Sequence, residues 1–226
     1  MLVQHNPDFL GIQESLPNQV EFIDHKLKGH ALIGFGRDGK GSASESVPVF
    51  YDNVKYQLLD WEVFWLSETP DIPSKGWDAA LNRITTYAVL KNRKAGDTTH
   101  VFNTHFDHRG ELSRKEAAAL LVKKIKALGL ERSRVILMGD LNSTPEEEPV
   151  QILRNVLQDA YAASEQRPRG PVGTFNAFDP DGVPDERIDY VFSLNARVLN
   201  YVNLDTRRRN GRWISDHLPV LVELAE

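Results

Sequence analysis

Acidic and histidine side chains that stand where apolar segments begin or end constrain this chain more than any other feature. The tetrapeptide Gly-Asp-Leu-Asn at residues 139–142 follows one apolar run, Asp189 lies inside a second, and Asp216 and His217 precede a third. A fold that gathers these segment ends also gathers their charges. Two carboxylates about 4 Å apart repel by roughly 4 kcal/mol at an effective dielectric constant of about 20. Because a divalent cation removes this repulsion, the pattern predicts a hard-metal site and favours phosphoryl transfer to water.

Composition restricts the classes of protein to which the chain can belong. Its 226 residues, 41% hydrophobic and 26% charged, suit a single domain over residues 1–226. The net charge of −5 gives no general support for binding duplex DNA. The absence of cysteine excludes disulfides and thiolate metal sites, so any metal must be held by oxygen and imidazole. No apolar stretch is long enough to span a membrane, and residues 1–6 do not form a signal peptide, so the chain as written is expected in the cytoplasm.

The spacing of apolar residues predicts an α+β fold in which strands outnumber helices. Residues 34–45, rich in glycine and serine, and the polar stretch 67–77 are expected to be loops. Helices are expected at residues 18–28, 113–128 and 147–157, the second opened by a capping box at 113–116. Strands are expected at residues 9–12, 47–51, 56–66, 84–90, 100–106, 134–138, 173–176, 188–194, 198–204 and 218–224. Because several neighbouring strands look like hairpins, we expect two mostly antiparallel sheets packed face to face with helices outside.

Each candidate side chain also has a purely structural explanation. Aspartate and asparagine are favoured turn residues, which would account for Asp140 and Asn142. Glu14, which follows an apolar strand, could be a surface acid, and Asp216 could merely end a loop. Asp189 is harder to explain in this way, because an acid inside an apolar strand needs a partner.

Two further features concern the substrate. The basic loop at residues 206–212, which includes Arg212, is either a solvated hairpin tip or a rim that steers a phosphate-bearing substrate. Trp65 and Trp77 flank the polar stretch and could stack on a base or a sugar ring, although core packing is an equal alternative for Trp65. An acidic chain with one small basic rim suits a compact phosphoester better than a long duplex.

Taken in order, these motifs resemble those of the endonuclease/exonuclease/phosphatase superfamily, the DNase I-like metal-dependent hydrolases. The resemblance covers nearly the whole chain, and residues 64–70 and 76–83 look most like a bacterial branch of unassigned substrate, with some likeness to deadenylases. Any one motif is weak, but five in order are specific. They are Pro-Asp-Phe-Leu-Gly-Ile-Gln-Glu at 7–14, Asn-Thr-His-Phe-Asp at 103–107, Gly-Asp-Leu-Asn at 139–142, Arg-Ile-Asp-Tyr at 187–190 and Ser-Asp-His at 215–217.

The resemblance implies a four-layered α/β sandwich with Mg²⁺, for which Mn²⁺ could substitute, at the edge of the sheets. It implies that Asp140 and Asn142 orient or deprotonate the attacking water, and that Asp189 hydrogen-bonds His217, which stabilises the pentacovalent phosphorus. His105 is expected to contact a phosphate oxygen, with Glu68 as a candidate partner. The implied residues are Glu14, Asp140 and Asp216 for the metal, His217, Asp140, Asn142, His105 and Asp189 for catalysis, and Asn142, His105, Arg83, Trp77 and Arg212 for substrate binding.

We therefore expect a Mg²⁺-dependent hydrolase of phosphoester bonds, a phosphodiesterase or a phosphatase, that works by in-line attack of water. The expected partner is a phosphorylated small molecule or single-stranded nucleic acid, the expected state is a monomer, and stable duplex DNA binding is not expected. The family begins with a strand that carries a metal-binding asparagine. We find no such strand after Met1 and expect an N-terminally truncated domain, whose missing segment could have carried an export signal. The alternatives are a non-catalytic binding module and an inactive fragment.

Overall fold

A six-stranded sheet in the order β4-β5-β6-β7-β9-β8 forms the centre of the molecule. The computed structural model of the protein describes residues 2–225. Neighbouring strands in this sheet are antiparallel except for β6 and β7, which are parallel because the long helix α3 connects them. The strands are β4 (Tyr56–Trp65), β5 (Ile84–Asn92), β6 (Thr98–His105), β7 (Arg134–Asp140), β8 (Gln158–Asp159) and β9 (Asp189–Leu194).

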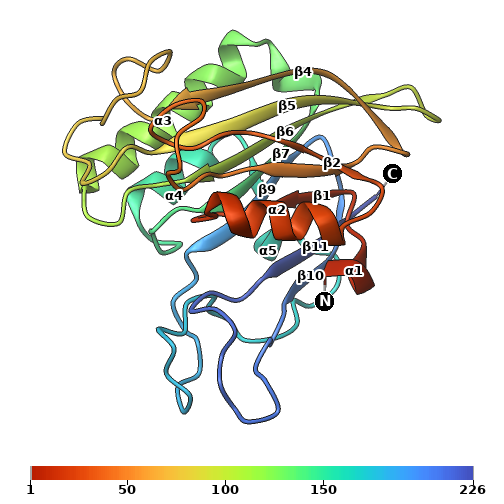
Figure 1. Cartoon of the computed structure of the whole chain (residues 1–226), viewed down its shortest axis with the longest axis vertical. Coiled ribbons are helices and arrows are strands. Elements are labelled where there is room, and N and C mark those ends of the chain that lie inside the picture. Colours follow the sequence, from red (N-terminus) through yellow and green to blue (C-terminus); the bar gives the residue numbers. More distant parts are fainter. Residues whose placement is uncertain (1, 226) are drawn as a thin grey trace.

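Two smaller antiparallel sheets accompany it, one with three strands in the order β1-β3-β2 and one formed by β10 and β11. Their strands are β1 (Phe9–Gly11), β2 (His30–Ile33), β3 (Val49–Asp52), β10 (Val198–Asn203) and β11 (Val220–Leu224). Figure 1 shows that the segments leading into β9 and β11 extend together away from the sheets, at the bottom of the view.

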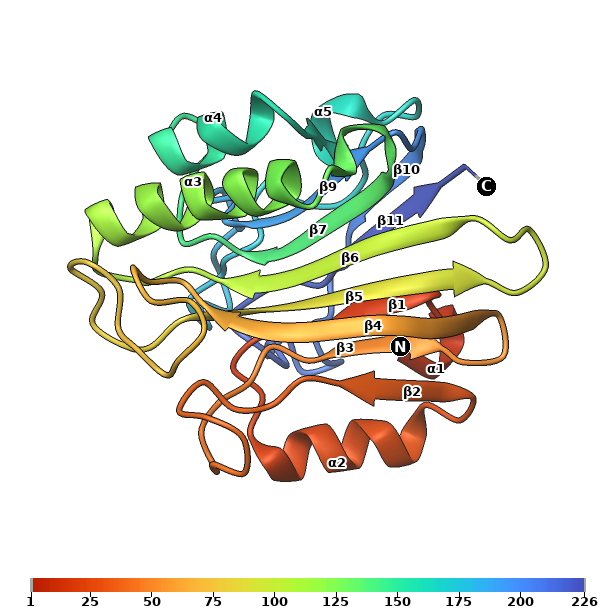
Figure 2. The same cartoon turned by 90° about the horizontal axis from the view of Figure 1, so that it is seen from above.

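Helices cover the outer faces, as Figure 2 shows with α3 and α4 on one side of the sheets and α2 on the other. The helices are α1 (Leu2–His5), α2 (Pro17–Lys26), α3 (Glu111–Ala127), α4 (Glu148–Arg154) and α5 (Ala160–Ala163), with a short 3-10 helix at Leu130–Arg132. The predicted sandwich of mostly antiparallel sheets between helices is confirmed, although the second sheet layer consists of two separately hydrogen-bonded parts. Among the described residues, no helix combines the length and the apolar character that a bilayer crossing requires.

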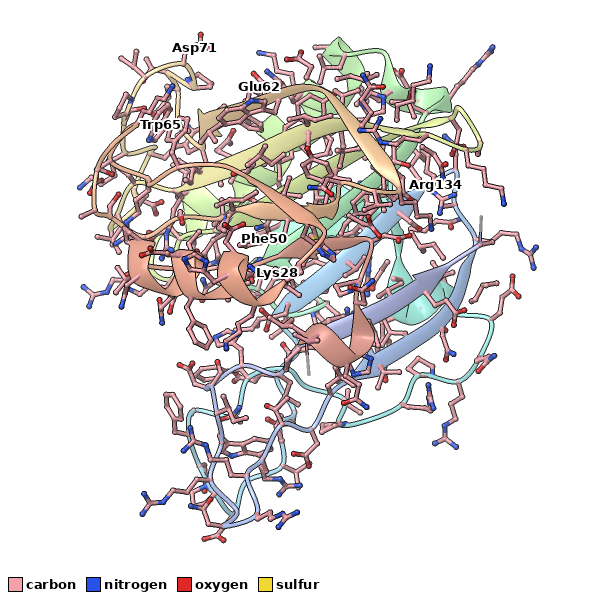
Figure 3. The ribbon with its side chains drawn as sticks, turned by 45° about the vertical axis from the view of Figure 1, so that its right-hand side comes forward. Lys28, Phe50, Glu62, Trp65, Asp71 and Arg134 are labelled. Atoms are coloured by element: carbon pink, nitrogen blue, oxygen red, sulfur yellow. The ribbon has the colours of Figure 1, made fainter. Side chains whose placement is uncertain are left out.

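Two hydrophobic clusters hold the layers together. The larger lies between the six-stranded sheet and helices α3 and α4, with members Phe64, Tyr87, Phe102, Leu121, Ile125, Leu137, Val150, Leu153, Tyr190 and Phe192. The second joins the opposite face of that sheet to β1-β3-β2, with members Ile33, Val49, Tyr51, Tyr56, Ala88, Leu90 and Val101. Each fully buried large apolar side chain contributes about 1.5–3 kcal/mol. Trp65, next to the loop that carries Asp71 (Figure 3), is 4% exposed, so core packing and not ligand stacking explains it.

Local structure differs from the sequence prediction in the start of one helix and in two strands. Helix α3 begins at Glu111 rather than at a capping box, because the carboxylate of the distant Asp78 accepts the backbone N–H of Ser113 at 2.7 Å. The predicted strand at 173–176 forms only isolated bridges, through Phe175. The short strand β2 was not predicted, because it lies between a helix-ending glycine and a glycine-rich loop.

Asn103, a fully buried residue on β6, ties the six-stranded sheet to the end of β1. Its side-chain amide donates hydrogen bonds to the carbonyl oxygens of Ile12 at 3.0 Å and Pro48 at 2.8 Å. Its Oδ1 accepts a third bond from Gln13 Nε2 at 2.6 Å. These bonds satisfy buried polar groups between the sheets and fix the backbone from which Glu14 projects.

Replacing Asn103 with alanine is expected to lower the free energy of unfolding by about 3 kcal/mol, because the carbonyl groups of Ile12 and Pro48 each lose a hydrogen-bond donor and the amide of Gln13 loses its acceptor. Urea denaturation measures the change. The control Gln57→Ala, at an exposed position of β4, should stay within about 0.5 kcal/mol of the unsubstituted protein. Equal stability of the two variants would show that Asn103 does not join the sheets energetically.

Candidate active site

The register of three adjacent strands places His105, Asp140 and Asp189 in a row. His105 is the last residue of β6 and stands opposite Asp140, the last residue of β7, because these strands run parallel. Asp189 is the first residue of β9 and stands opposite Asp140 from the other side, because β7 and β9 run antiparallel. Directly paired residues project to the same face of a sheet, so three side chains that are distant in sequence converge.

The turn after β7 depends on a glycine and an asparagine. Gly139 has a φ of 150°, and a Cβ atom there would lie 2.0 Å from the carbonyl oxygen of Thr104, so no other residue fits against β6. Asn142 has a φ of 46°, a left-handed conformation that asparagine tolerates, and its backbone N–H donates to Asp140 Oδ1 at 2.8 Å. Its amide nitrogen donates to the carbonyl of Phe106 at 3.1 Å and lies 3.2 Å from His105 Nε2.

His217 enters the site from the segment before β11. Backbone bonds from Asn176 to the Asp216 carbonyl and from Leu218 to the Thr174 carbonyl hold that segment against residues 174–176. The expected hydrogen bond is present, since His217 Nδ1 lies 2.8 Å from Asp189 Oδ2.

The charge of His217 follows from these contacts. Burial alone lowers its pKa, but the hydrogen bond and charge of Asp189 and the charges of Asp140 and Asp216 outweigh burial and raise the pKa to about 9. His217 is therefore an imidazolium at neutral pH, with Nε2 4.0 Å from Asp140 Oδ2.

The pKa values of Asp140 and His105 are shifted in favour of their neutral forms, whereas that of His217 is shifted in favour of its charged form. Burial and the neighbouring charge of Asp189 raise the pKa of Asp140 to about 7. Burial, with the charges of Arg83 and His217, holds the pKa of His105 well below its usual range, so this ring is neutral. Arg83 Nη1 donates to the ring at 3.0 Å, and His105 Nε2 lies 3.4 Å from Asp140 Oδ2.

The side chains of Asp140, Asp189 and His217 each offer one ligand atom, and these atoms lie within 4.8 Å of one another. Carboxylate oxygens suit Mg²⁺ or Mn²⁺, and the raised pKa of Asp140 marks a buried negative charge without full compensation. The donor set of the site therefore fits a divalent cation.

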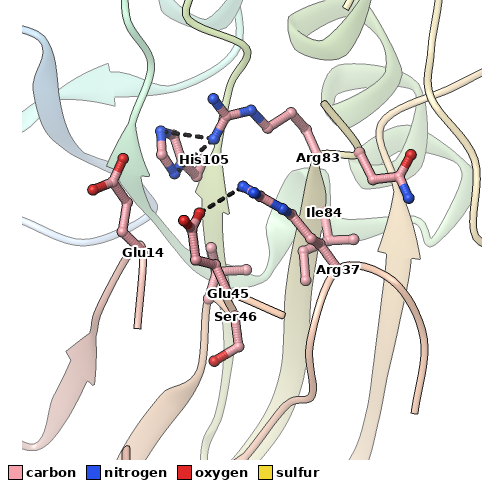
Figure 4. A pocket seen from close by; sticks show the side chains of 9 residues that line it. Glu14, Arg37, Glu45, Ser46, Arg83, Ile84 and His105 are labelled. Atoms are coloured by element: carbon pink, nitrogen blue, oxygen red, sulfur yellow. Dashed lines mark hydrogen bonds and ion pairs between the residues drawn. The ribbon is translucent and has the colours of Figure 1, made fainter. Parts of the chain in front are cut away.

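Glu14 belongs to a pocket beside this row. Its φ of 55° is a left-handed conformation, which costs about 1–3 kcal/mol for a non-glycine residue and is typical of functional sites. Figure 4 shows the carboxylates of Glu14 and Glu45 and the guanidinium groups of Arg37 and Arg83 gathered around the His105 ring. Glu14 therefore shares a pocket with His105, whose Nε2 lies 3.4 Å from Asp140 Oδ2, beside the cluster of Asp140, Asp189 and His217.

Arg83 and Asp107 form a buried support under the site. Arg83 Nε donates to Asp107 Oδ2 at 3.3 Å, with both side chains at most 5% exposed. Asp107 Oδ1 also accepts the backbone N–H groups of Ala80, Arg109 and Gly110. Burial raises the pKa of Asp107, but these backbone bonds outweigh burial and lower it well below its ordinary value.

The structure places the remaining predicted residues less centrally. Asp216 is half-buried beside His217, and its backbone carbonyl accepts from Asn176. Trp77 is half-buried and Arg212 is exposed, and neither lines the pocket that contains Glu14. Glu68, the candidate partner of His105, accepts the backbone N–H of Trp77 at 3.2 Å.

Sequence reasoning did not identify Arg37, Glu45 and Asn82, which line the same pocket. Arg37 and Glu45 lie near the two ends of the glycine- and serine-rich loop. The sequence held one signal for them: an arginine and a glutamate near the two ends of a glycine-rich loop between apolar runs can form an ion pair across a hairpin.

Comparison with known proteins identifies relatives of this chain. A sequence model of the endonuclease/exonuclease/phosphatase family matches residues 1–217. The solved structure of a mannosyl-6-phosphatase from Bacteroides thetaiotaomicron has a TM-score of 0.92 and 38% identity, and the match covers 100% of this chain and 88% of the other.

Two further relatives extend over almost the whole chain. The structure of an endonuclease/exonuclease/phosphatase from Bacteroides vulgatus has a TM-score of 0.91 and 34% identity, covering 99% of this chain and 87% of the other. An uncharacterised protein of Acanthamoeba polyphaga mimivirus is 31% identical over 230 residues, which is 97% of this chain and 81% of the relative.

Replacing Asp189 with asparagine is expected to lower the pKa of His217 from about 9 toward the ordinary value of 6.5, because the charged acceptor of its Nδ1 proton is lost. Nitrogen-15 NMR of the imidazole in the metal-free protein measures the titration. The control Asp97→Asn, on an exposed turn, should leave the titration of His217 unchanged. An unaltered pKa in Asp189→Asn would contradict the assigned ion pair.

Replacing Asp107 with asparagine is expected to lower the free energy of unfolding at pH 7 by at least about 2 kcal/mol, because the N–H donors and Arg83 lose a charged acceptor. The folded-state pKa lies below the ordinary 3.8, so this stability is complete above that value and is lost as the pH falls below it. Thermal unfolding between pH 7 and pH 2 measures the difference in stability between Asp107→Asn and the unsubstituted protein. This difference should become smaller in the acid range. A stability difference that does not change with pH would show that the charge of Asp107 is not its cause.

Proposed function

The chain belongs to the endonuclease/exonuclease/phosphatase family, and we propose that it is a divalent-metal-dependent hydrolase of phosphoester bonds. One observation carries this proposal: Asp140, Asp189 and His217 converge, with N and O atoms within 4.8 Å of one another, and the buried carboxylate of Asp140 lacks full charge compensation. Members of the family generally use divalent metal ions, and the relative from Bacteroides thetaiotaomicron is a phosphatase by name. Acidic and imidazole groups that perturb one another's protonation are also typical of catalytic sites.

Asp140 is the proposed centre of metal binding, with Glu14 and Asp216 as its partners. Asp189 is engaged by His217 at 2.8 Å, so its charge is already compensated, whereas Asp140 keeps an uncompensated buried carboxylate. A bound Mg²⁺ or Mn²⁺ would neutralise non-bridging phosphate oxygens and promote ionisation of water.

The protein's own side chains divide the remaining work. Asp140, whose pKa burial raises in the metal-free protein, is placed to accept a proton from the attacking water as general base. The imidazolium of His217, held by Asp189, faces the same region and would stabilise negative charge that grows on the equatorial oxygens. The amide of Asn142 and the neutral ring of His105 supply hydrogen bonds that would orient the phosphate.

We infer that the substrate is a phosphomonoester of a small hydroxylated molecule. The name of the 38%-identical mannosyl-6-phosphatase supports this class, because that relative matches the whole of this chain. The net charge of −5 also disfavours a long polyanion. Phosphodiesters and single-stranded nucleic acid belong in the same test panel, since the site would accommodate the same in-line displacement on either.

Activity should require the metal and the central side chains. Release of phosphate from mannose 6-phosphate and phenyl phosphate, and of alcohol from diesters, is expected with Mg²⁺ and not with excess chelator. Asp140→Asn and His217→Ala should each lower kcat by at least about 100-fold, the range that positioned acid–base groups contribute. His25→Ala and Asp97→Asn, both at exposed positions, are matched controls that should retain activity.

Two results would contradict the proposed function. The first is an unsubstituted protein that folds, binds Mg²⁺ and yet turns over no phosphoester in the panel. The second is unchanged kcat in both Asp140→Asn and His217→Ala.

A further inference from the structure

The pocket beside the metal-binding row has a wall that the proposed reaction does not use. This wall consists of the 34–46 loop, which joins β2 to β3, and of Asn82. Arg37 Nη1 and Glu45 Oε2 form an ion pair at 2.5 Å, with the two side chains 17% and 33% exposed. Together with Asn82 they line the same pocket as Glu14 and His105.

The loop holds Arg37 and Glu45 in fixed positions. The backbone N–H of Arg37 donates to the carbonyl of Glu45 at 2.9 Å, and the indole N–H of the buried Trp65 donates to the carbonyl of Arg37 at 2.6 Å. Ser46, next to Glu45, bonds through its backbone and side chain to Ser15. The bonds between Arg37 and Glu45, to Trp65 and to Ser15 hold the wall in one conformation before a ligand arrives. Such preorganisation lowers the entropic cost of binding.

The chemistry of the wall suits neutral hydroxyl groups rather than another phosphate. The carboxylate of Glu45 neutralises Arg37 at contact distance, so the pair offers no net positive charge. The pair still offers N–H donors from the guanidinium and acceptor oxygens from the carboxylate. Asn82 adds an amide group: its nitrogen donates to Asp38 at 2.9 Å, and its oxygen can accept a hydrogen bond from a ligand. A hydroxyl group both donates and accepts, and two neighbouring hydroxyls match such a set.

A nucleobase fits this wall less well. Nucleobases are usually held by stacking on aromatic side chains or on a free guanidinium plane. Among the described residues that line the pocket, none is phenylalanine, tyrosine or tryptophan, and Arg37 is already occupied by Glu45.

We propose that Arg37, Glu45 and Asn82 form a subsite that binds the hydroxyl groups of a phosphorylated sugar or a similar polyol while its phosphate lies at Asp140 and His105. The subsite rests on the proposed function, because the sugar or polyol that it binds is the leaving group of the proposed hydrolysis. It makes Arg37 and Glu45 specificity-determining residues, since they would distinguish a polyol phosphate from a phosphomonoester of equal charge without hydroxyl groups.

Steady-state kinetics on two substrates tests the subsite. With Mg²⁺, Glu45→Gln and Arg37→Ala should lower kcat/KM for mannose 6-phosphate by about tenfold or more, chiefly through KM, because hydrogen bonds from charged groups to the hydroxyls are lost. The same variants should keep kcat/KM for phenyl phosphate within about twofold. Glu165→Gln and Arg197→Ala are matched controls, because these residues form an exposed pair of the same kind, with Arg197 Nη2 at 2.8 Å from Glu165 Oε1.

Free mannose provides a second measurement that does not depend on the phosphate. It should inhibit hydrolysis of phenyl phosphate competitively in the unsubstituted protein, and this inhibition should weaken at least tenfold in Glu45→Gln. Equal losses on both substrates, no loss on either, or unchanged inhibition by mannose would each overturn the subsite. Failure of the proposed function looks different, because the unsubstituted protein would then hydrolyse neither substrate.

Discussion

The pairing of β7 with β6 on one side and β9 on the other is the constraint on which the site depends. The parallel pair brings the ends of two strands to the same edge, and the antiparallel pair adds the beginning of a third. His105, Asp140 and Asp189 therefore meet without any of them being close in sequence. Because side chains alternate along a strand, a slip of one residue would turn Asp140 into the opposite layer. The buried apolar residues of β7 prevent such a slip, so the hydrophobic core and the geometry of the proposed site share one determinant.

Electrostatics then separates the acids of the site into two kinds. Asp189, Asp107 and Glu45 each have a cationic partner at contact distance. Asp140 has a neutral His105 at 3.4 Å and the imidazolium of His217 only at 4.0 Å. The compensated acids position other groups, whereas the uncompensated one is free to interact with a cation and a water proton. Burial makes this difference matter, because charges interact strongly where water is excluded.

The proposed catalytic residues and the proposed subsite come from different parts of the fold. Residues on the strand ends come from the central sheet and are held by its register. Arg37 and Glu45 come instead from a loop that is tied to the rest of the molecule by bonds to Trp65, Ser15 and Asn82. A loop of this kind can change without disturbing the reacting groups, which is how one scaffold serves several phosphoesters.

The apolar runs, most helix and strand positions, and the five motifs that place acids and histidines at strand ends can be read from the amino-acid order alone, because these signals are local and periodic. The likeness to a family supplied the four-layered form of the sandwich and the partnership of Asp189 with His217. Only the tertiary structure decided that Asp78 caps α3, that Trp65 packs in the core, that Asp107 supports Arg83, and that Arg37 faces Glu45 beside His105. Each of these contacts joins segments whose separation along the chain carries no periodic signal, so it exists only once the sheets have brought those segments together.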